Sequence, residues 1–364
     1  MKYYIIAGEA SGDLHGSKIM ESIKKLDKKA KFRFWGGEKM KGIGGEIVKH
    51  INQLSFMGFW EVLKNIFTIF KNISLCKRDI NTYQPDKIVY IDYPGFNMVI
   101  AKWAKKIGFQ NHFYISPQIW AWKESRIKKI KRDIDYLYVI LPFEKEYYQK
   151  KHNLDVYYVG HPLVEIINKE KKNTDLFPFT LTKPVIALLP GSRKQEIKKM
   201  MPVYKSVVNH FSNYEFIIAG VSNINKDWYS KFLKEDKIKI VYDNTYNLLK
   251  KSTAAIVTSG TATLETALFD VPQIVCYKSS LFSYLVGKLF IKLKFISLVN
   301  IIMDKEVVKE LIQKDCSKRN IVYELSQLLK NENILSVKKE YEILRNKLGK
   351  EETSLKVAKL ITKV

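Results

Sequence analysis

The chain has 364 residues, of which 46% are hydrophobic, and both values are ordinary for a globular protein of two domains. Three widely separated cysteines (Cys76, Cys276 and Cys316) argue against a disulfide framework or a zinc site, and they fit a reducing cytoplasm. The net charge of +25 favours an anionic partner, which is either nucleic acid, an anionic membrane or a phosphorylated substrate, unless it is only a solvated lysine surface.

The N-terminus reads as a strand, a loop and a helix. Residues 3–7 are apolar, residues 8–16 (GEASGDLHG) are rich in small residues, and apolar spacing predicts a helix over 17–26. This order is typical of a doubly wound α/β domain. The loop is not GxGxxG and carries two carboxylates, so it suits a hydroxyl-rich ligand better than a pyrophosphate. The alternative is a tight turn before a capped helix. We expect neither a signal peptide nor a transmembrane helix, because no apolar run is long enough.

A broad aromatic helix is predicted over residues 56–75 (FMGFWEVLKNIFTIFKNISL), after a second strand over 32–35. Its polar residues recur at helical spacing and leave only one narrow polar face. Such a helix either lies in a membrane interface or is buried on several sides in a protein core. The pattern alone favours neither interpretation.

The strand over residues 87–91 (KIVYI) delivers Asp92 at its carboxyl end, where ligands of open α/β sheets bind. A turn over 93–97 and a helix over 98–107 follow. A carboxylate at this place is a candidate general base. A helix N-cap is the other common role of an aspartate here.

An aromatic and basic stretch follows the next strand, over residues 112–116. It contains Trp120 and Trp122 and then a cationic run over 126–132, which suits base stacking, lipid headgroups or a solvated helix face. Residues 133–135 spell DxD, but they lie between a helix end and a strand over 136–141, so we interpret the motif as accidental. A strand over 156–159 ends near His161, which lines a cleft or shapes a turn.

A polar linker over residues 169–182 precedes a second α/β half. A strand over 185–189 runs into Gly191, Ser192 and Arg193, and a helix begins at 194. Glycine, the N–H groups of a helix start and an arginine fork together suit a phosphate, although a plain turn with a solvated arginine has the same pattern. The chain has 55 Lys and only 7 Arg, so an arginine here is not a default surface charge.

A second glycine loop follows in the same half. Strands are predicted over residues 214–219, 237–241 and 254–257, and the last one enters a Gly/Thr loop before a helix over 264–269. Two such loops in one domain fit one diphosphate better than either does alone. The rest of the chain is predicted to contain a strand over 272–277, a helix around 310–313 and a helical tail over 317–364. A second apolar segment, over 281–303, lies between that strand and that helix and suits a membrane surface.

These motifs together resemble those of the lipid-A-disaccharide synthases. The matching stretches are GEASGDLHG (8–16), MGFWEVL (57–63), YIDYPGFN (90–97), YISPQIWAWK (114–123), LPFEKEYY (141–148), VGHPLV (159–164), LLPGSRKQEI (188–197) and SGTATLETAL (259–268). They span nearly the whole chain in the order of the family, and GEASGD with SPQIWAWK is highly specific.

The resemblance implies an α/β fold of GT-B architecture, with two Rossmann-like domains whose parallel sheets face each other across a cleft. It implies an acceptor- and membrane-binding domain over 1–168 and a UDP-sugar-binding domain over 183–340. The helical tail over 341–364 then packs back on the first domain or is exchanged in a homodimer. The family joins UDP-2,3-diacylglucosamine to 2,3-diacylglucosamine 1-phosphate (lipid X) by inverting transfer, without metal or other cofactor. It works at the cytoplasmic face of the inner membrane of Gram-negative bacteria.

The resemblance also assigns roles to residues. The catalytic aspartate of the family falls on Asp92, which would deprotonate the 6-hydroxyl of the acceptor. The nucleotide is assigned to Gly191, Ser192, Arg193, Ser259, Gly260, Thr261, Glu265, Asn300, Glu310 and Gln313, with Glu310 on the ribose. The acceptor is assigned to Glu9, Ser11, Gly12, Asp13 and His15. Membrane or acyl-chain contact is assigned to Met57, Phe59, Trp60, Leu63, Ile66, Phe67 and Phe70.

The chain departs from the family at two positions, and three other functions compete. Gly95 replaces a second acid of many relatives, and Val299 precedes Asn300 where proline is usual. A lipid II-forming transferase would have a different N-terminal loop, and a UDP-N-acetylglucosamine 2-epimerase would need no aromatic lipid surface. An RNA-binding protein would leave the loops at Gly191 and Gly260 unexplained. We therefore expect no nucleic acid partner.

Overall fold

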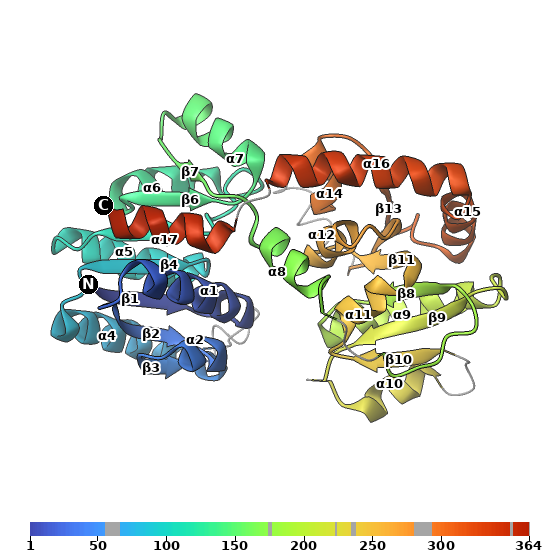
Figure 1. The fold of residues 1–364 in the computed structure, drawn as a ribbon, viewed down its shortest axis with the longest axis horizontal. Coiled ribbons are helices and arrows are strands. Elements are labelled where there is room, and N and C mark those ends of the chain that lie inside the picture. Colours follow the sequence, from blue (N-terminus) through green and yellow to red (C-terminus); the bar gives the residue numbers. More distant parts are fainter. Residues whose placement is uncertain are drawn as a thin grey trace. The chain divides into compact units, whose positions relative to one another are not determined.

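The computed structural model describes residues 1–54, 66–173, 177–222, 224–233, 238–279, 293–349 and 352–363. The chain divides into two compact units. Unit 1 comprises Met1–Pro162 and Lys350–Val364, and unit 2 comprises Leu163–Gly349 (Figure 1). The chain therefore passes from one unit to the other after Pro162 and after Gly349, whereas we predicted domain ends at 168 and 340. The tail is split at Gly349, and only its last helix belongs to unit 1.

Unit 1 is built on a seven-stranded parallel sheet with the order β3-β2-β1-β4-β5-β6-β7. Its central strands are nearly continuous apolar runs, as expected for a sheet that is covered on both faces. The strands are β1 (Lys2–Ala7), β2 (Lys31–Gly36), β3 (Glu46–His50), β4 (Lys87–Ile91), β5 (Asn111–Tyr114), β6 (Tyr136–Val139) and β7 (Tyr157–Tyr158).

Helices cover both faces of this sheet. Tyr4 and Ile6 of β1 pack into a core with α4 (Ile66–Tyr83), α5 (Pro94–Lys106) and α6 (Ile127–Asp133). Helix α1 (Ala10–Leu26) contacts α2 (Glu38–Ile43) and the final helix α17 (Thr353–Lys363), which lies beside it (Figure 1). The remaining short helices are η1 (Ile51–Gln53), η2 (Glu124–Arg126), α7 (Pro142–Glu146) and the π-helical turn η3 (Tyr147–Lys151).

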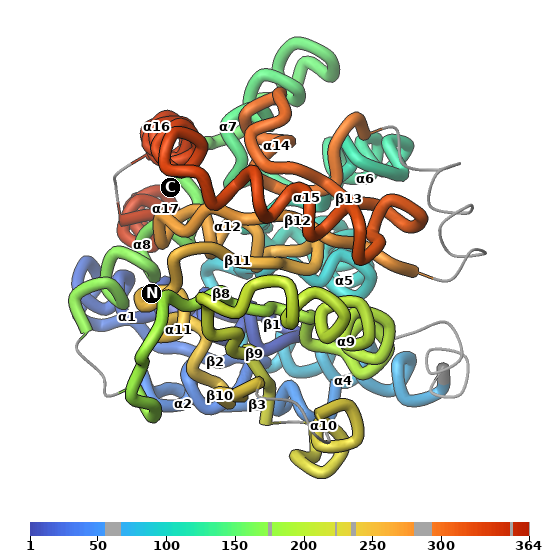
Figure 2. The backbone as a smooth tube through the Cα atoms, turned by 90° about the vertical axis from the view of Figure 1, so that its right-hand side faces the viewer, coloured from blue at the N-terminus to red at the C-terminus, as the bar shows by residue number. Residues whose placement is uncertain are grey.

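Unit 2 has a six-stranded parallel sheet with the order β10-β9-β8-β11-β12-β13. The strands are β8 (Val185–Leu189), β9 (Glu215–Gly220), β10 (Lys239–Tyr242), β11 (Ser252–Thr258), β12 (Gln273–Tyr277) and β13 (Lys309–Ile312). Figure 2 shows α9 (Lys194–Val208) and α15 (Lys318–Leu328) on one face and α11 (Thr245–Lys250) and α12 (Thr261–Leu268) on the other. The other helices are α8 (Pro162–Glu170), α10 (Lys226–Leu233), α14 (Leu298–Met303) and α16 (Asn331–Leu348).

Three helices begin earlier than predicted. α1 starts at Ala10 rather than 17, α5 at Pro94 rather than 98, and α12 at Thr261 rather than 264. Gly12 explains the first difference, because a Cβ there would lie only 3.1 Å from the Cβ of Ala7, so glycine lets α1 pack on β1. Proline at the start of α5 has a φ angle suited to the first helical position. Small residues whose pattern predicted loops therefore form the first turns of these three helices.

The prediction of a helix around 310–313 is wrong. Residues Lys309–Ile312 form β13, which pairs with β12 in parallel register and closes the unit 2 sheet. β13 is the last strand in the order of this sheet, and of its four residues only Leu311 is buried, as is usual for an edge strand. Gly349, at a φ of +84°, ends α16, as the predicted break requires.

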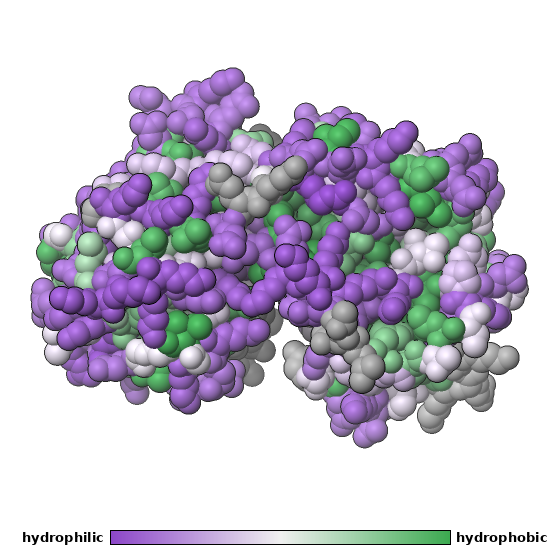
Figure 3. All heavy atoms as spheres, in the orientation of Figure 1, coloured by the Kyte–Doolittle hydropathy of each residue, from purple (hydrophilic) through white to green (hydrophobic). Residues whose placement is uncertain are grey.

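One face of the molecule is mostly hydrophilic (Figure 3). On the face shown in Figure 3, hydrophobic side chains are scattered among hydrophilic ones on both units. No helix within the described ranges is both long and apolar enough to cross a bilayer.

Candidate active site

Two acidic residues come together at the carboxyl edge of the unit 1 sheet. Glu9 follows β1 and Asp92 follows β4, and these strands pair with Ala7 beside Ile91. Parallel strands end at one edge, where ligands of such sheets bind. The negative charge of Glu9 acts on Asp92 and raises its pKa. The structure therefore places the predicted base and the predicted acceptor residue Glu9 side by side.

Asp92 has the protonation behaviour of a general base. Burial is the larger cause and the charge of Glu9 the smaller one, and together they raise the pKa of Asp92 from 3.8 to about 6. The backbone N–H of Tyr93 opposes this by donating to the carboxylate. At neutral pH Asp92 is still mostly ionised, but it holds a proton more strongly than an ordinary aspartate does. A base whose pKa lies near the working pH is the most effective.

The backbone at Asp92 is held in an unusual conformation. Asp92 and Tyr93 have φ angles of 46° and 50°, in the left-handed region, which costs a non-glycine residue about 1–2 kcal/mol. The buried Asn97 stabilises it, because its Nδ2 donates to the Asp92 carbonyl at 2.6 Å. Asn97 is therefore a positioning residue for Asp92. Sequence analysis missed this role, since it treated Asn97 only as part of the 93–97 turn.

A close approach between Gly8 and Tyr93 joins the two strand ends. A Cβ at Gly8 would lie 2.4 Å from two ring carbons of Tyr93. The Tyr93 ring also packs on Phe96, with centroids 5.8 Å apart. Glycine is thus required at the end of β1 because the ring beside Asp92 fills the space of a side chain.

Two histidines lie near the same edge, of which His161 is buried and His15 is half-buried. His15 is on α1, and its ring stands edge-on to Tyr114, the last residue of β5, with centroids 6.4 Å apart. Burial lowers the pKa of His15 to about 4, and burial together with the nearby His15 lowers that of His161 to about 3. Both rings are therefore neutral at pH 7 and can donate and accept hydrogen bonds. The sequence left two roles open for His161, either lining a cleft or shaping a turn. In the structure His161 lies close to the predicted acceptor residue His15.

The other predicted acceptor residues lie on α1 rather than in a loop. Ser11 is exposed, whereas Gly12 and Asp13 are buried. The Asp13 carboxylate accepts hydrogen bonds at 2.7, 3.1 and 3.0 Å from the backbone N–H groups of Gly37, Lys39 and Met40. Because these bonds satisfy the start of α2, we assign Asp13 to capping that helix and not to the acceptor.

The predicted membrane-contact residues are covered only in part. Met57, Phe59, Trp60 and Leu63 lie outside the described residues, as does the side chain of Ile66. Phe67 and Phe70, near the start of α4, are 78% and 63% exposed. Neighbouring exposed phenylalanines are typical of a surface that binds an apolar partner.

The loops after β8 and β11 share one cavity of about 360 Å³ at the carboxyl edge of the unit 2 sheet. The starts of α9 and α12 lie there, and their backbone N–H groups favour an anion. The predicted nucleotide residues that line the cavity are Gly191, Ser192, Arg193, Ser259, Gly260, Thr261 and Glu265. The structure thus brings both glycine loops together, as one diphosphate would require.

Gly191 and Arg193 have distinct geometry in this cavity. Gly191 has a φ of +104°, and a Cβ there would lie 2.5 Å from the Oε2 of Glu196. Arg193 is an exposed cation, and its guanidinium donates to the Oε1 of Glu196 at 3.0 Å. Glu196, which sequence analysis did not select, therefore positions the arginine at the cavity.

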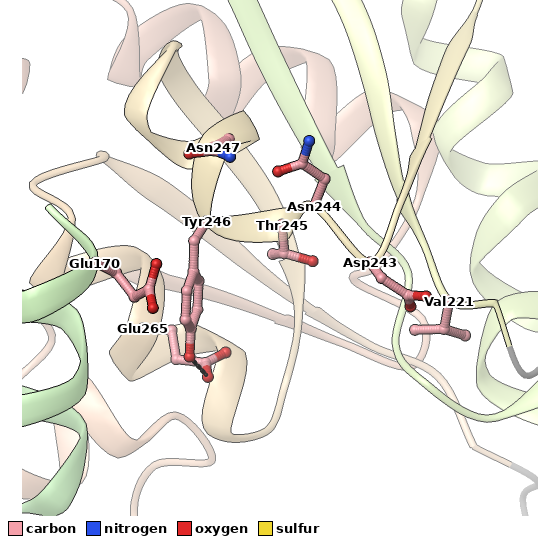
Figure 4. A pocket seen from close by; sticks show the side chains of 8 residues that line it. All are labelled: Glu170, Val221, Asp243, Asn244, Thr245, Tyr246, Asn247 and Glu265. Atoms are coloured by element: carbon pink, nitrogen blue, oxygen red, sulfur yellow. Dashed lines mark hydrogen bonds between the residues drawn. The ribbon is translucent and has the colours of Figure 1, made fainter. Parts of the chain in front are cut away.

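A second cavity of about 440 Å³ adjoins the first, since both are lined by Val221, Thr245 and Glu265 (Figure 4). Val221 follows β9 and residues 243–247 follow β10, and sequence analysis missed these residues although it predicted both strands. The rule that ligands bind beyond the carboxyl ends of strands would have found them. The others that line it are Glu170, Asp243, Asn244, Tyr246 and Asn247.

Glu265 connects the two cavities. The Tyr246 hydroxyl donates to the Oε1 of Glu265 at 2.9 Å (Figure 4). Burial raises the pKa of Glu265, and the hydrogen bond from Tyr246 lowers it. A carboxylate in this place can accept hydrogen bonds from hydroxyl groups of a bound ligand.

Asn300 is not among the residues that line the two cavities. It is fully buried on α14, where its amide donates to the Val308 carbonyl at 2.8 Å and to Glu310 at 2.9 Å. Its carbonyl oxygen accepts from the N–H groups of Val307 and Val308. These bonds engage the whole amide, so Asn300 holds the segment before β13, and its contact with the nucleotide stays a prediction.

Glu310 and Gln313 have similar internal roles. Glu310, on β13, accepts hydrogen bonds at 2.9 Å from the N–H groups of Ile296 and Ser297. Gln313 follows the strand and bonds to the backbone and the hydroxyl of Ser279. Glu310 also accepts hydrogen bonds from the Ser297 hydroxyl and from the Asn300 amide. With four hydrogen bonds in all, the carboxylate has little capacity left to bind a ribose. The assignment of Glu310 to the ribose stays a prediction.

The two acids of the DxD motif have protein partners. Asp133 is buried and accepts two hydrogen bonds from Arg132, at 2.6 and 2.7 Å. Asp135 accepts from the backbone N–H of Asn111 at 2.9 Å and pairs with Lys105. Both carboxylates are thus used in folding.

Two units with parallel sheets, and a cavity beyond the strand ends of the second, define an α/β protein of GT-B architecture. Solved structures share this fold. A UDP-GlcNAc 2-epimerase from Neisseria meningitidis, bound to UDP-GlcNAc, has a TM-score of 0.64 at 13% identity and covers 100% of this chain and 99% of its own. A UDP-GlcNAc 2-epimerase from Methanocaldococcus jannaschii, in complex with UDP-GlcNAc and UDP, has a TM-score of 0.67 at 14% identity, and the match covers 100% of both chains. At such identities the likeness concerns the fold alone.

The family is defined by sequence. Residues 3–364 match the lipid-A-disaccharide synthetase family. A lipid-A-disaccharide synthase from Coxiella burnetii is 37% identical over 98% of this chain and 96% of its own, and one from Syntrophus aciditrophicus is 35% identical over 95% and 93%. The chain therefore belongs to the lipid-A-disaccharide synthase family and is a glycosyltransferase of lipid A biosynthesis. The family and the GT-B fold expected from the motifs are confirmed.

Proposed function

We propose that this enzyme condenses UDP-2,3-diacylglucosamine with 2,3-diacylglucosamine 1-phosphate (lipid X), and forms lipid A disaccharide 1-phosphate and UDP. Family membership supports the type of reaction, and the state of Asp92 supports the mechanism. The observation on which the proposal rests is a strand-end carboxylate whose pKa is raised to about 6 by burial and by Glu9.

The reaction is an inverting displacement with one base. Asp92 takes the proton of the acceptor 6-hydroxyl, and the oxygen attacks the anomeric carbon of the donor. The bond between that carbon and the diphosphate breaks, and UDP leaves with the electron pair. Arg193 and the N–H groups at the start of α12 stabilise the growing charge on the diphosphate. No step of this scheme uses a metal or a cofactor.

The lipid substrates explain the surface of the enzyme. Acyl chains contact the exposed Phe67 and Phe70, and the charge of +25 is attracted to phosphorylated lipids in an anionic leaflet. The enzyme then works as a peripheral protein on the cytoplasmic face of the inner membrane. In a homodimer, the segment after Gly349 is the part that two subunits would exchange.

A detergent-micelle assay tests the proposal. Purified protein receives UDP-2,3-diacylglucosamine and lipid X with EDTA present, and UDP and disaccharide are followed. Asp92→Ala is expected to lose about 100-fold or more in turnover, as for removal of a general base. Asp155→Ala, an exposed aspartate of the same unit, serves as the control and keeps the wild-type rate.

The outcomes separate function from mechanism. Wild-type turnover that survives Asp92→Ala would keep the reaction and move the base to Glu9 or His15. Absence of disaccharide with the wild type would refute the reaction. Conversion of unacylated UDP-N-acetylglucosamine instead would point to a different nucleotide-sugar enzyme.

A further inference from the structure

A groove of about 390 Å³ lies between α5 and α6 of unit 1. We call it the α5–α6 groove. Met98, Val99 and Ile130 give it apolar walls, and Lys102, Arg126 and Lys129 add three cations. Arg126 comes from the cationic run over 126–132, to which the proposed reaction assigns no role.

Four cations and one acid, Asp133, line this groove, so most of its positive charge is not balanced. Arg132, which also lines it, pairs with the buried Asp133. In the described part of the chain, no acidic side chain lies within ion-pair distance of Lys102, Arg126 or Lys129. Arg126 is instead half-buried and stacks on Trp122, 5.1 Å from the ring centroid. A concave site with apolar walls and three uncompensated cations suits an amphiphile with an anionic head.

The groove begins beside the proposed base. Pro94 and Gly95, at the start of α5, line it, and Pro94 is only two residues from Asp92. Two residues span at most about 7 Å, so one sugar ring can reach from Asp92 to the groove. A Cβ at Gly95 would meet no atom within 4 Å, so this entrance is open.

We propose that the α5–α6 groove binds the phosphate of the acceptor lipid and the first part of one acyl chain. The inference rests on the proposed function, because it takes lipid X as the acceptor. Arg126 and Lys129 hold the phosphate, and the walls formed by Met98, Val99 and Ile130 contact the acyl chain. The 6-hydroxyl, on the other side of the sugar, then lies toward Asp92. The ligand is a phosphate monoester that carries acyl chains, not a free phosphate and not a flat membrane surface.

Paired variants at and just before α6 test this assignment. The double variant Arg126→Ala/Lys129→Ala removes two groove cations, and Lys128→Ala/Lys131→Ala removes the same charge from exposed positions of α6 that do not line the groove. A hydrogen bond to a charged group contributes about 1.5–3 kcal/mol, so the first variant should raise the KM for lipid X about 10-fold or more. The KM for the donor and kcat at saturating acceptor should stay within about twofold.

The acceptor phosphate provides the specific readout. The wild type should prefer lipid X over 2,3-diacylglucosamine, which lacks the phosphate, and the groove variant should lose this preference. The proposal is overturned if the preference is unchanged, or if the control pair loses as much affinity as the groove pair, because bulk surface charge would then explain the effect. Circular dichroism checks that both variants are folded.

A binding experiment judges the groove even if the proposed reaction fails. Monomeric decyl phosphate is titrated against tryptophan fluorescence, with decyl glucoside and inorganic phosphate as comparisons. Decyl phosphate should bind best, and more weakly to the groove variant than to the control. Equal binding of decyl phosphate and inorganic phosphate would refute the role of the apolar walls. Equal binding of decyl phosphate and decyl glucoside would refute the role of the cations.

Discussion

Replacement of Asp92 by asparagine should remove activity and at the same time stabilise the protein. Burial and the charge of Glu9 raise the pKa of Asp92 from 3.8 to about 6. Such a carboxyl group favours folding while it is protonated, below pH 3.8, and loses that contribution as the pH rises through 6. At neutral pH the wild type therefore holds an ionised group in an unfavourable place. An amide of the same shape carries no charge at any pH.

The size of the effect follows from the pKa values. A rise from 3.8 to about 6 corresponds to about 3 kcal/mol between the protonated and ionised forms. Asp92→Asn should gain up to about 3 kcal/mol in the free energy of unfolding at pH 7.5, and the gain should vanish near pH 3.8. Turnover should fall by about 100-fold or more, because the amide takes up no proton.

Urea titrations at several pH values between 4 and 7.5 measure this directly. The exposed Asp155→Asn in the same unit should change stability by no more than about 0.5 kcal/mol at any pH, as is usual for surface substitutions. If Asp92→Asn is no more stable than the wild type at pH 7.5, or if its gain does not shrink on acidification, then Asp92 is not held in a desolvated and repulsive site.

Three further substitutions test neighbouring parts of both sites. Glu9→Gln removes the charge that repels the ionised Asp92. The acidic limb of the pH profile of kcat/KM should therefore move below pH 6, by up to about 1 unit. An unchanged limb would mean that the two carboxylates do not interact. Asn97→Ala removes the hydrogen bond to the Asp92 carbonyl. Thermal unfolding should show that the free energy of unfolding falls by about 1–2 kcal/mol, and steady-state assays should show a lower kcat. A normal kcat would refute the positioning role of Asn97. Arg193→Ala should weaken UDP binding in calorimetry about 10-fold, while Lys194→Ala, the next cation along the chain, should change it less than threefold; equal losses would indicate only general charge.

The sequence predicted the strands of both sheets well but misplaced the helix starts. Apolar runs such as 87–91 and 185–189 fix a strand by themselves, because both faces of a parallel sheet are buried. The start of a helix depends on what it packs against. Gly12 reads as a loop residue, and it belongs to a helix only because α1 lies directly on Ala7.

The candidate site was predicted where residues follow strand ends and missed where contacts are not local. Gly191 and Gly260 line the predicted cavity because both follow parallel strands. By contrast, the carboxylate of Asp13 caps a helix whose residues lie more than 20 positions away. Nothing in the local pattern distinguishes a carboxylate that caps such a helix from one that faces a ligand. The internal bonds of Asn300 were not predicted either, because its partners Val307, Val308 and Glu310 lie further along the chain.

The N-terminal unit concentrates groups that are unfavourable for folding at its carboxyl edge, and its last helix compensates for them. Asp92 is ionised while partly buried, His15 is half-buried and uncharged, and His161 is buried and uncharged. Helix α1 begins directly after Glu9 and carries His15, and α17 packs along it with Val357, Ala358 and Ile361 buried. Burial of large aliphatic side chains contributes about 1.5–3 kcal/mol each, enough to offset one poorly solvated carboxylate. The end of the chain therefore stabilises the helix that shapes the acceptor side of the site, although no residue of α17 has a proposed role in the reaction.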